Sequence, residues 1–225
     1  MFFQSKAFTV LIVAGSPQVS SPKFLAEKAK EAQYIIACDS GAISCMKAQI
    51  PIDVLIGDND SLDAQALEYA RSCNAKEELY PCDKDETDLK LAISYVWKNI
   101  APKHKHIDLV VSCASGGRPD HALGVIGNLI EAQALHPRIE EEHFTCYILS
   151  HEWDDHIVFG ADKCQKTLSI IALENPTKLS IRSCKWSKES WTLRAFSDQG
   201  ISNIIEKPGA SILVHQGSVL CYLID

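Results

Sequence analysis

Apolar runs alternate with segments of helical composition through the first two thirds of the chain. The runs are short and continuous, which is typical of strands that are buried on both faces of a sheet. The segments predicted as strands are 7–14, 34–38, 54–56, 77–82, 107–113 and 143–150. The segments predicted as helices are 22–32, 62–73, a stretch ending at about 97, and 122–135. This alternation predicts an α/β fold whose mainly parallel sheet has helices on both faces.

From about residue 151 the pattern changes to short apolar stretches separated by turn residues. Such spacing is typical of an all-β unit. We therefore expect two domains: residues 1–150 as an α/β nucleotide- and metal-binding catalytic domain, and residues 151–225 as a smaller, sandwich-like all-β domain. A unit of this size buries little core, so we expect it to pack on the first domain or on a second subunit.

Composition narrows the possible partners and the compartment. The formal net charge of −7 argues against nucleic acid as a partner. The nine cysteines include no Cys-x-x-Cys pair, which argues against a zinc site or a disulfide framework and predicts a cytoplasmic protein. The apolar run 7–15 is too short to span a membrane and lacks the pattern of a secretion signal, so we expect no membrane association.

The candidate chemistry centres on Gly57-Asp58-Asn59-Asp60-Ser61, which follows the predicted strand 54–56. Strand residues alternate sides, so Asp58 and Asp60 point the same way. Two neighbouring carboxylates at the carboxyl end of a strand suit Mg2+, which prefers hard oxygen ligands. The alternative is a solvated turn with an Asp cap, or a cap at Ser61, for the next helix.

Three further polar motifs stand where a predicted strand gives way to a helix. They are Asp39-Ser40-Gly41-Ala42, Asp83-Lys84-Asp85-Glu86-Thr87-Asp88 and Gly116-Gly117-Arg118-Pro119-Asp120-His121. Glycines at such a junction allow backbone N–H groups to approach phosphates, and a guanidinium matches phosphate oxygens. The structural alternatives are a turn for the first motif, a capping box at Asp85 and Asp88 for the second, and a surface Arg–Asp ion pair for the third.

In this order, and with the later Gly200-Ile201-Ser202-Asn203, the motifs resemble the thiamine pyrophosphokinase family along nearly the whole chain. The resemblance implies Mg2+-dependent transfer of a pyrophosphoryl group from ATP to the hydroxyl of thiamine, which gives thiamine diphosphate and AMP. It also implies a homodimer with active sites at the interface.

The resemblance further implies roles for individual residues. The acidic catalytic centre comprises Asp39, Asp58, Asp60, Asp88 and Asp120, of which Asp58, Asp60 and Asp88 are the expected metal ligands. Lys84, Thr87 and Arg118 match positions near the nucleotide phosphates. Trp186, Ser202 and Asn203 match the thiamine-binding half. Asp60, Asp88 and Asp120 all remain candidates for the carboxylate that accepts the proton of the alcohol.

Two other classes of function remain as alternatives. A metal-dependent nucleotide-sugar transferase would also use an Asp-x-Asp at a strand end, but it leaves the 83–88 cluster and the Ser202-Asn203 segment unexplained. A non-catalytic nucleotide or thiamine sensor would not require the full set of acids.

Overall fold

The computed structural model describes residues 7–58, 62–83, 85–153 and 156–225. Two of the expected site residues, Asp60 and Lys84, lie outside the described residues. The chain divides into two compact units: unit 1 comprises residues 1–142 and unit 2 comprises residues 143–225. Each unit is described by itself.

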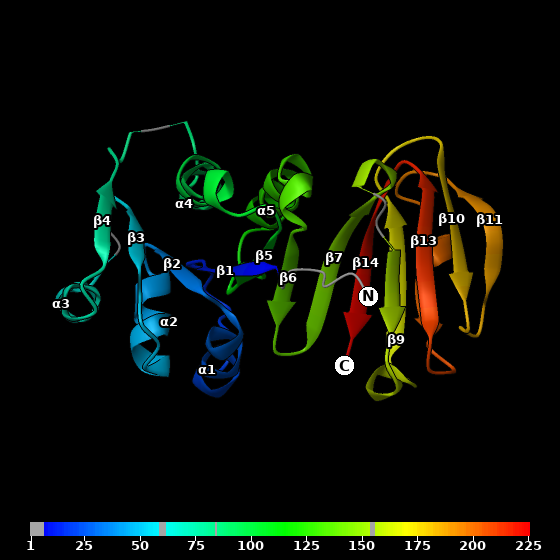
Figure 1. The fold of residues 1–225 in the computed structure, drawn as a ribbon, viewed down its shortest axis with the longest axis horizontal. Helices are drawn as coiled ribbons and strands as arrows, with labels where there is room; N and C mark the ends of the chain where they lie inside the picture. The colour runs from blue at the N-terminus through cyan, green and yellow to red at the C-terminus, as the bar shows by residue number, and fades with distance from the viewer. Residues whose placement is uncertain (1–6, 59–61, 84, 154–155) are drawn as a thin grey trace. The chain divides into compact units, whose positions relative to one another are not determined.

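Unit 1 alternates strands and helices, as the sequence predicts (Figure 1). Its strands are β1 (Phe8–Val13), β2 (Tyr34–Cys38), β3 (Val54–Gly57), β4 (Lys76–Leu79), β5 (Ile107–Ser112) and β6 (Arg138–Glu141). Its α-helices are α1 (Pro22–Glu31), α2 (Gly41–Ala48), α3 (Ala64–Ser72), α4 (Asp88–Tyr95) and α5 (Pro119–Glu131). Short turns of other helix types follow α4 (Val96–Ile100, Ala101–Lys103) and α5 (Gln133–Leu135).

The strands of unit 1 lie in the order β6-β5-β1-β2-β3-β4, and every neighbouring pair is parallel. Helices α1, α2 and α3 cover one face of this sheet, and α4 and α5 lie on the other (Figure 1). The predicted fold class is therefore confirmed for this unit. The chain builds outward from β1 to β4 in one direction and then returns to β5 and β6 on the other side of β1. The order reverses between β1 and β5, the point at which open α/β sheets bind ligands.

Local sequence signals determine where the helices begin. The side chains of Ser21, Asp63 and Thr87 each accept a hydrogen bond from a backbone N–H in the first turn of α1, α3 and α4. These N-caps satisfy donors that have no partner within a helix. The capping box at Asp85 and Asp88, which was the structural alternative for this motif, does not form: Thr87 is the N-cap and Asp88 is the first residue of α4.

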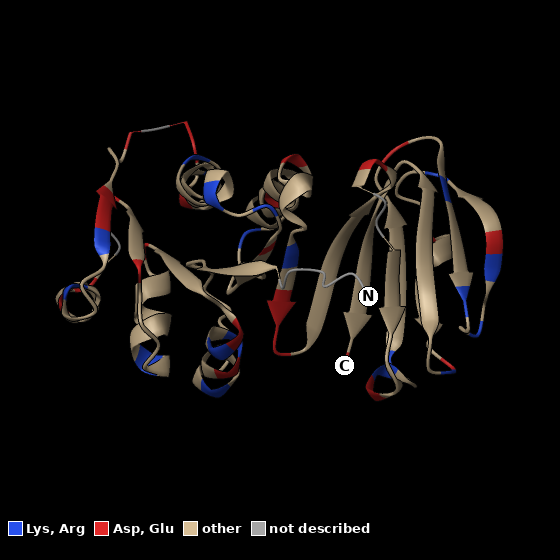
Figure 2. Cartoon of the chain, viewed as in Figure 1, with Lys and Arg blue, Asp and Glu red and all other residues tan. Residues whose placement is uncertain are grey.

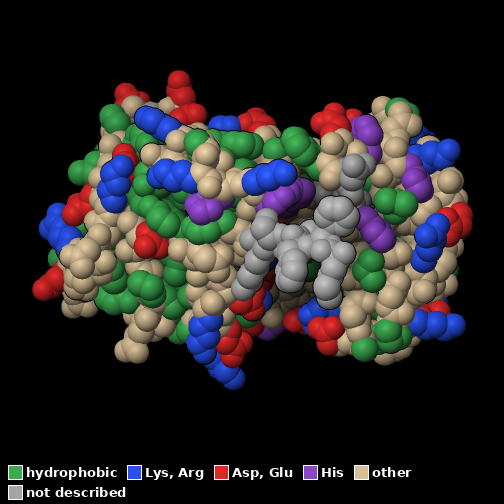
Figure 3. Space-filling model, in the orientation of Figure 1, with side chains coloured by type: hydrophobic (Ala, Val, Ile, Leu, Met, Phe, Trp, Pro, Cys, Tyr) green, Lys and Arg blue, Asp and Glu red, His purple; other side chains and the backbone are tan. Residues whose placement is uncertain are grey.

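Helix α5 is apolar in sequence but mostly uncovered. Leu129 is its buried residue, while 70% of Leu123 is exposed. Hydrophobic side chains reach the surface over α4 and α5 (Figure 3). Among the described residues, no helix combines the length and the apolar character needed to cross a membrane.

Unit 2 consists of two antiparallel sheets, β12-β9-β14-β7 and β11-β10-β13-β8. Its strands are β7 (Phe144–Ser150), β8 (His156–Phe159), β9 (Thr167–Ala172), β10 (Thr177–Arg182), β11 (Lys188–Leu193), β12 (Asn203–Ile204), β13 (Ala210–Gln216) and β14 (Ser218–Ile224). Side chains from both sheets, including Ile170, Leu179, Ile212 and Val219, form one buried core. This is the sandwich-like β unit that the sequence predicts.

The segment 143–150 differs from its expected place. It does not close the strand–helix alternation, because β7 pairs antiparallel with β14 inside unit 2. The last strand of unit 1 is instead β6, which the apolar pattern did not indicate.

Candidate functional site

A pocket of about 610 Å3 opens at the carboxyl ends of the unit 1 strands, where the strand order reverses. The loop that follows β1 lines one part, and the loop that follows β5 lines another. Among the lining residues are five that the sequence predicts: Asp39, Thr87, Asp88, Arg118 and Asp120. The structure therefore gathers residues from four separate loops and helix starts at one place.

The carboxylate of Asp39 lies against the end of β3. The backbone N–H of Asp39 donates a hydrogen bond to Ile56 O at 3.0 Å, which connects the end of β2 to β3. A Cβ added to Gly57 would lie only 1.7 Å from Asp39 Oδ1, so the glycine leaves the space that the carboxylate fills. Asp58 is the next residue and is half-buried. It follows that Asp39 and the beginning of the Asp58–Asp60 motif meet at neighbouring strand ends.

Asp88 approaches the same place from α4. Its carbonyl oxygen accepts a weak hydrogen bond from Cys38 Sγ at 3.7 Å. Burial raises the pKa of the Cys38 thiol well above its usual value, and the negative charges of Asp88 and Asp39 raise it further. Both carboxylates thus lie close enough to influence one thiol, which stays neutral. The loop between β4 and α4, which leads into Asp88, is itself strongly acidic (Figure 2).

These carboxylates supply the hard oxygen ligands that Mg2+ prefers. In the part of the chain that the structure describes, however, no group of three or more Asp, Glu, His or Cys side chains is arranged to hold a metal ion. The expected ligand Asp60 is outside that part, and Asp58 is not among the residues that line the pocket. The residues present fit Mg2+ by donor chemistry, and the metal site stays a prediction.

Arg118 and Asp120 form a bidentate ion pair at the start of α5. The distances are 3.1 Å from Arg118 Nε to Oδ1 and 2.6 Å from Nη2 to Oδ2. The hydrogen bond from Arg118 lowers the pKa of Asp120 to about 2, and that of Arg118 is raised by the same contact. Both side chains are largely exposed, so the pair matches the alternative that the sequence left open. It nevertheless lies on the rim of the pocket, where Asp120 fixes the direction of the guanidinium.

Thr87 has a structural contact beside its place in the pocket. Its hydroxyl caps α4 by accepting from Lys90 N at 3.3 Å, and Asn128 Nδ2 on α5 donates to it at 3.4 Å. Asn128 also lines the pocket, and sequence reasoning missed it. The available signal was that it is the only polar residue in the stretch 122–130.

The loop after β1 was also missed as part of the site, because the sequence showed Gly15-Ser16-Pro17 only as the end of a strand. These residues line the pocket, and Ser40 Oγ donates to Gly15 O at 3.3 Å across to the end of β2. Only the strand order, which places β1 beside β5, reveals their location.

The other three predicted residues are in unit 2. Asn203 is buried, and its side chain is bound to the turn at Trp186: Oδ1 accepts from Trp186 N at 3.0 Å, and Nδ2 donates to Trp186 O at 3.1 Å. The ammonium of Lys185 lies 4.6 Å from the ring centroid of Trp186, which is half exposed. Ser202 N donates to Ser169 Oγ at 3.0 Å. Asn203 thus holds the backbone of Trp186 in place by two hydrogen bonds. The ring of Trp186 remains half exposed to solvent.

Comparisons with known proteins give a consistent result. A thiamine pyrophosphokinase of Bacillus subtilis is 32% identical over 120 residues, which are 52% of this chain and 52% of that protein. Thiamine pyrophosphokinase 1 of rice is 23% identical over 159 residues, which are 69% of this chain and 60% of that protein. The chain thus spans little more than half the length of these curated relatives.

Solved structures share the fold. The crystal structure of the Bacillus subtilis thiamine pyrophosphokinase has a TM-score of 0.81 at 21% identity and covers 96% of this chain and 98% of its own. The Candida albicans thiamin pyrophosphokinase has a TM-score of 0.77 at 17% identity and covers 98% and 90%. The model of the thiamin pyrophosphokinase catalytic domain matches residues 25–140, which is more than half of the chain. The chain therefore belongs to the thiamin pyrophosphokinase family.

Proposed function

We propose that the protein transfers a pyrophosphoryl group from ATP to the hydroxyl of thiamine, giving thiamine diphosphate and AMP. The observation that supports this most is the pocket at the reversal of strand order, where Asp39 and Asp88 line the same space as Gly116 and Arg118. Transfer of a phosphoryl-type group depends mainly on positioning and on neutralisation of charge, and this arrangement offers both.

The triphosphate would lie along the loop 116–118 and the start of α5. Gly116 and Gly117 have φ values of +82° and +71°, so this loop adopts backbone conformations that favour glycine and keep the peptide groups accessible to a ligand. Arg118 would exchange part of its contact with Asp120 for phosphate oxygens, to which its planar fork is equally suited.

Mg2+ would be held by Asp58, Asp60 and Asp88, with Asp39 beside them. When bound there, it would neutralise charge on the transferred phosphates.

The proton of the thiamine hydroxyl needs an acceptor in the pocket. While the ion pair with Arg118 is intact, the pKa of Asp120 is lowered to about 2, so in that arrangement the carboxylate is a weak base and serves better to hold Arg118. Among the described candidates for the base, this leaves Asp88, which lines the pocket at the first turn of α4. Its role would be to orient the alcohol and accept its proton as the new P–O bond to the alcohol oxygen forms and the P–O bond to the departing AMP breaks.

Unit 2 would provide the thiamine-binding half. The half-exposed Trp186 ring offers an aromatic face for the cationic thiazolium or the pyrimidine of thiamine, and Asn203 keeps its backbone in place. We further propose that the protein is a cytoplasmic homodimer. The uncovered apolar surface of α5 supports dimerisation, because an exposed apolar surface of this kind is typical of an interface.

The reaction is tested by incubating purified protein with ATP, Mg2+ and thiamine and measuring AMP. We expect AMP release that requires thiamine, and a loss of about a hundredfold or more in Asp58→Asn and Asp88→Asn. Binding of ATP or thiamine without AMP release would indicate a sensor. Turnover of a nucleotide sugar in place of ATP would indicate a transferase of the other class.

A further inference from the structure

The carboxylate of Glu141, at the end of β6, lies within the loop that follows β5. Its Oε1 accepts hydrogen bonds from the backbone N–H groups of Ala114 at 2.9 Å and Ser115 at 3.2 Å, and its Oε2 accepts from Cys113 N at 3.2 Å. Three successive peptide N–H groups that converge in this way form a hollow that binds anions. Cys113, with φ of +56°, turns the chain at this point. A buried side chain of the protein itself thus fills an anion site.

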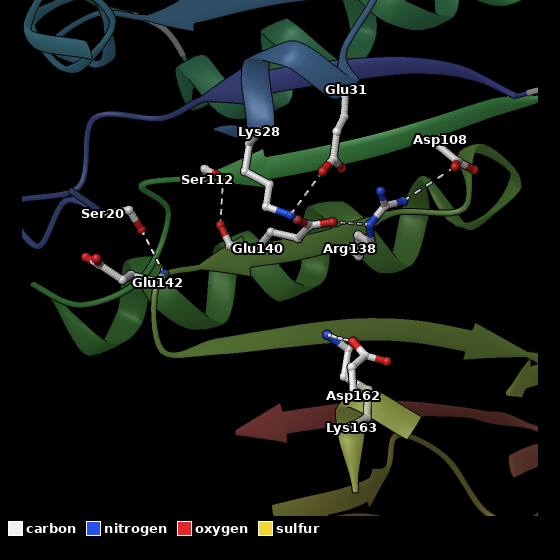
Figure 4. Close-up of polar contacts among 10 residues, drawn as sticks. All are labelled: Ser20, Lys28, Glu31, Asp108, Ser112, Arg138, Glu140, Glu142, Asp162 and Lys163. Carbon is white, nitrogen blue, oxygen red and sulfur yellow. Dashed lines mark hydrogen bonds and ion pairs between the residues drawn. The ribbon is translucent and has the colours of Figure 1, made fainter. Parts of the chain in front are cut away.

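The same corner anchors the start of α1. Ser20 Oγ donates to Glu141 Oε2 at 2.6 Å. It also accepts from Glu142 N at 3.1 Å, and Figure 4 shows this second contact. The carboxylate of Glu142 in turn accepts from the N–H and the hydroxyl of Ser21, at 3.1 and 2.8 Å. The end of β6 therefore holds both the loop after β5 and the segment that enters α1.

These two segments also contact each other directly, at the pocket. Ser16 Oγ donates to Ser115 O, which links the loop after β1 to the loop after β5. A Cβ on Gly117 would lie 2.7 Å from Pro17 Cγ, so the two loops pack without space between them. A displacement at residues 113–115 would therefore reach both loops that line the pocket.

We propose that Glu141 is a positioning residue for the nucleotide. By holding the peptide groups of 113–115, its carboxylate sets the place and direction of Gly116–Arg118, which follow immediately in the chain. Glu141 is not among the residues that line the pocket, so it acts through the loop and not on the ligand. The identity of the ligand as ATP rests on the proposed function, whereas the effect on the loop does not.

The chain offers a matched control for this proposal. Glu140 is the preceding residue of β6, and each of the two glutamates is 7% exposed. The carboxylate of Glu140 binds Lys28 Nζ at 2.8 Å and Arg138 Nε at 2.5 Å (Figure 4). Glu140→Gln therefore removes a buried carboxylate from the same strand without removing a contact to the loop. Glu141→Gln removes the charge and replaces one of the two acceptor oxygens by an NH2 donor, so that at least one N–H group of 113–115 loses its acceptor.

Hydrogen–deuterium exchange and steady-state kinetics together test the proposal. In Glu141→Gln we expect the amides of 113–118 to exchange about tenfold faster and the KM for ATP to rise by about tenfold or more, with the KM for thiamine changed less than about twofold. Ser20→Ala should shift both quantities in the same direction by less, and it carries the test if Glu141→Gln does not fold. Glu140→Gln should lower the melting temperature but leave loop exchange and the KM for ATP near wild type.

Two results would overturn the proposal. One is wild-type loop exchange and a wild-type KM for ATP in Glu141→Gln, or in Ser20→Ala if only that variant folds. The other is an equal change of both quantities in Glu140→Gln, which would show a general effect of destabilisation. If the wild-type protein releases no AMP from ATP and thiamine, the proposed function fails, and the exchange measurement still decides the role of Glu141 in the loop.

Discussion

The contact between Gly57 and Asp39 allows a sharp test of the acidic centre by the substitution Gly57→Ala. The new methyl carbon would lie 1.7 Å from Asp39 Oδ1 and 2.6 Å from Cγ. Carbon and oxygen atoms pack at roughly 3.5 Å, so the carboxylate must move by about 2 Å. The nearest atoms all belong to this one side chain, which is why we expect the carboxylate, not the sheet, to give way.

Such a displacement should reduce turnover far more than stability. A misplacement of about 1 Å at a catalytic centre can lower the rate by about a hundredfold, so we expect a loss of at least that size. Overpacking of a buried site lowers the free energy of unfolding by about 1–3 kcal/mol, which leaves the protein folded. The φ of +154° at Gly57 adds to the loss of stability, because alanine rarely adopts this backbone conformation.

The assay is thiamine-dependent AMP release at saturating substrates, with urea unfolding measured in parallel. Gly127→Ala is the control, since a Cβ at that exposed position on α5 meets no atom within 4 Å. Replacing a helical glycine by alanine without overpacking should stabilise the protein by about 0.5–1 kcal/mol, in contrast to Gly57→Ala.

A double mutant shows whether the destabilisation by Gly57→Ala comes from the clash with the Asp39 carboxylate or from the backbone. In an Asp39→Ala background the carboxylate is gone, so Gly57→Ala should destabilise the protein less than it does in the wild type. Equal destabilisation in both backgrounds would place the effect in the backbone and refute the reasoning. So would a Gly57→Ala protein that turns over at the wild-type rate.

Three further results are expected. Burial pushes the pKa of Glu140 up, but Arg138 and Lys28 more than offset this and hold it below its usual 4.5. The ionised carboxylate therefore stabilises the protein above about pH 4.5, and this contribution is lost as the pH falls. At pH 7 we expect Glu140→Gln to lower the free energy of unfolding by roughly 3 kcal/mol. Urea unfolding should show that this difference between variant and wild type shrinks toward pH 3. The carboxyl carbon of Asp120 should titrate by NMR near pH 2, and Arg118→Ala should return the midpoint to about 4; an unchanged midpoint would exclude the ion pair in solution. Denatured, non-reduced protein should show nine thiols, whereas native protein should react fastest at the exposed Cys82; a count well below nine would contradict this.

The sequence predicted most strands of unit 1 because they are buried on both faces, and burial of that kind leaves an uninterrupted apolar run. It failed at β6, Arg-Ile-Glu-Glu, because charged residues normally indicate exposure. Here Glu140 is buried between Arg138, two residues earlier in the same strand, and Lys28, which comes from α1, while Glu141 is buried against the backbone N–H groups of a loop more than 25 residues away. Long-range ion pairs and hydrogen bonds of this kind leave no periodic signal.

Residues of the candidate site could be predicted where a sequence motif itself indicates the chemistry. They were harder to predict where only the order of the strands brings a residue to the site. Asp39, Asp88 and Arg118 were found from strand-to-helix junctions, and they line one pocket. Ser16 and Asn128 were missed because their place depends on which strands are neighbours. Strand order follows from the packing of the whole sheet, which a single segment does not encode.

The backbone at Asp39 has a consequence for how this protein could change over time. Its φ is +43°, a left-handed conformation that costs most residues about 1 kcal/mol or more, and that glycine adopts freely. Asp39→Gly would relieve this strain and remove one negative charge from a crowded group of acids. The substitution should therefore make the fold more stable while deleting a carboxylate from the pocket. If the proposed role of Asp39 holds, stability and activity are in opposition at this position, and a screen for heat resistance alone would favour loss of this carboxylate.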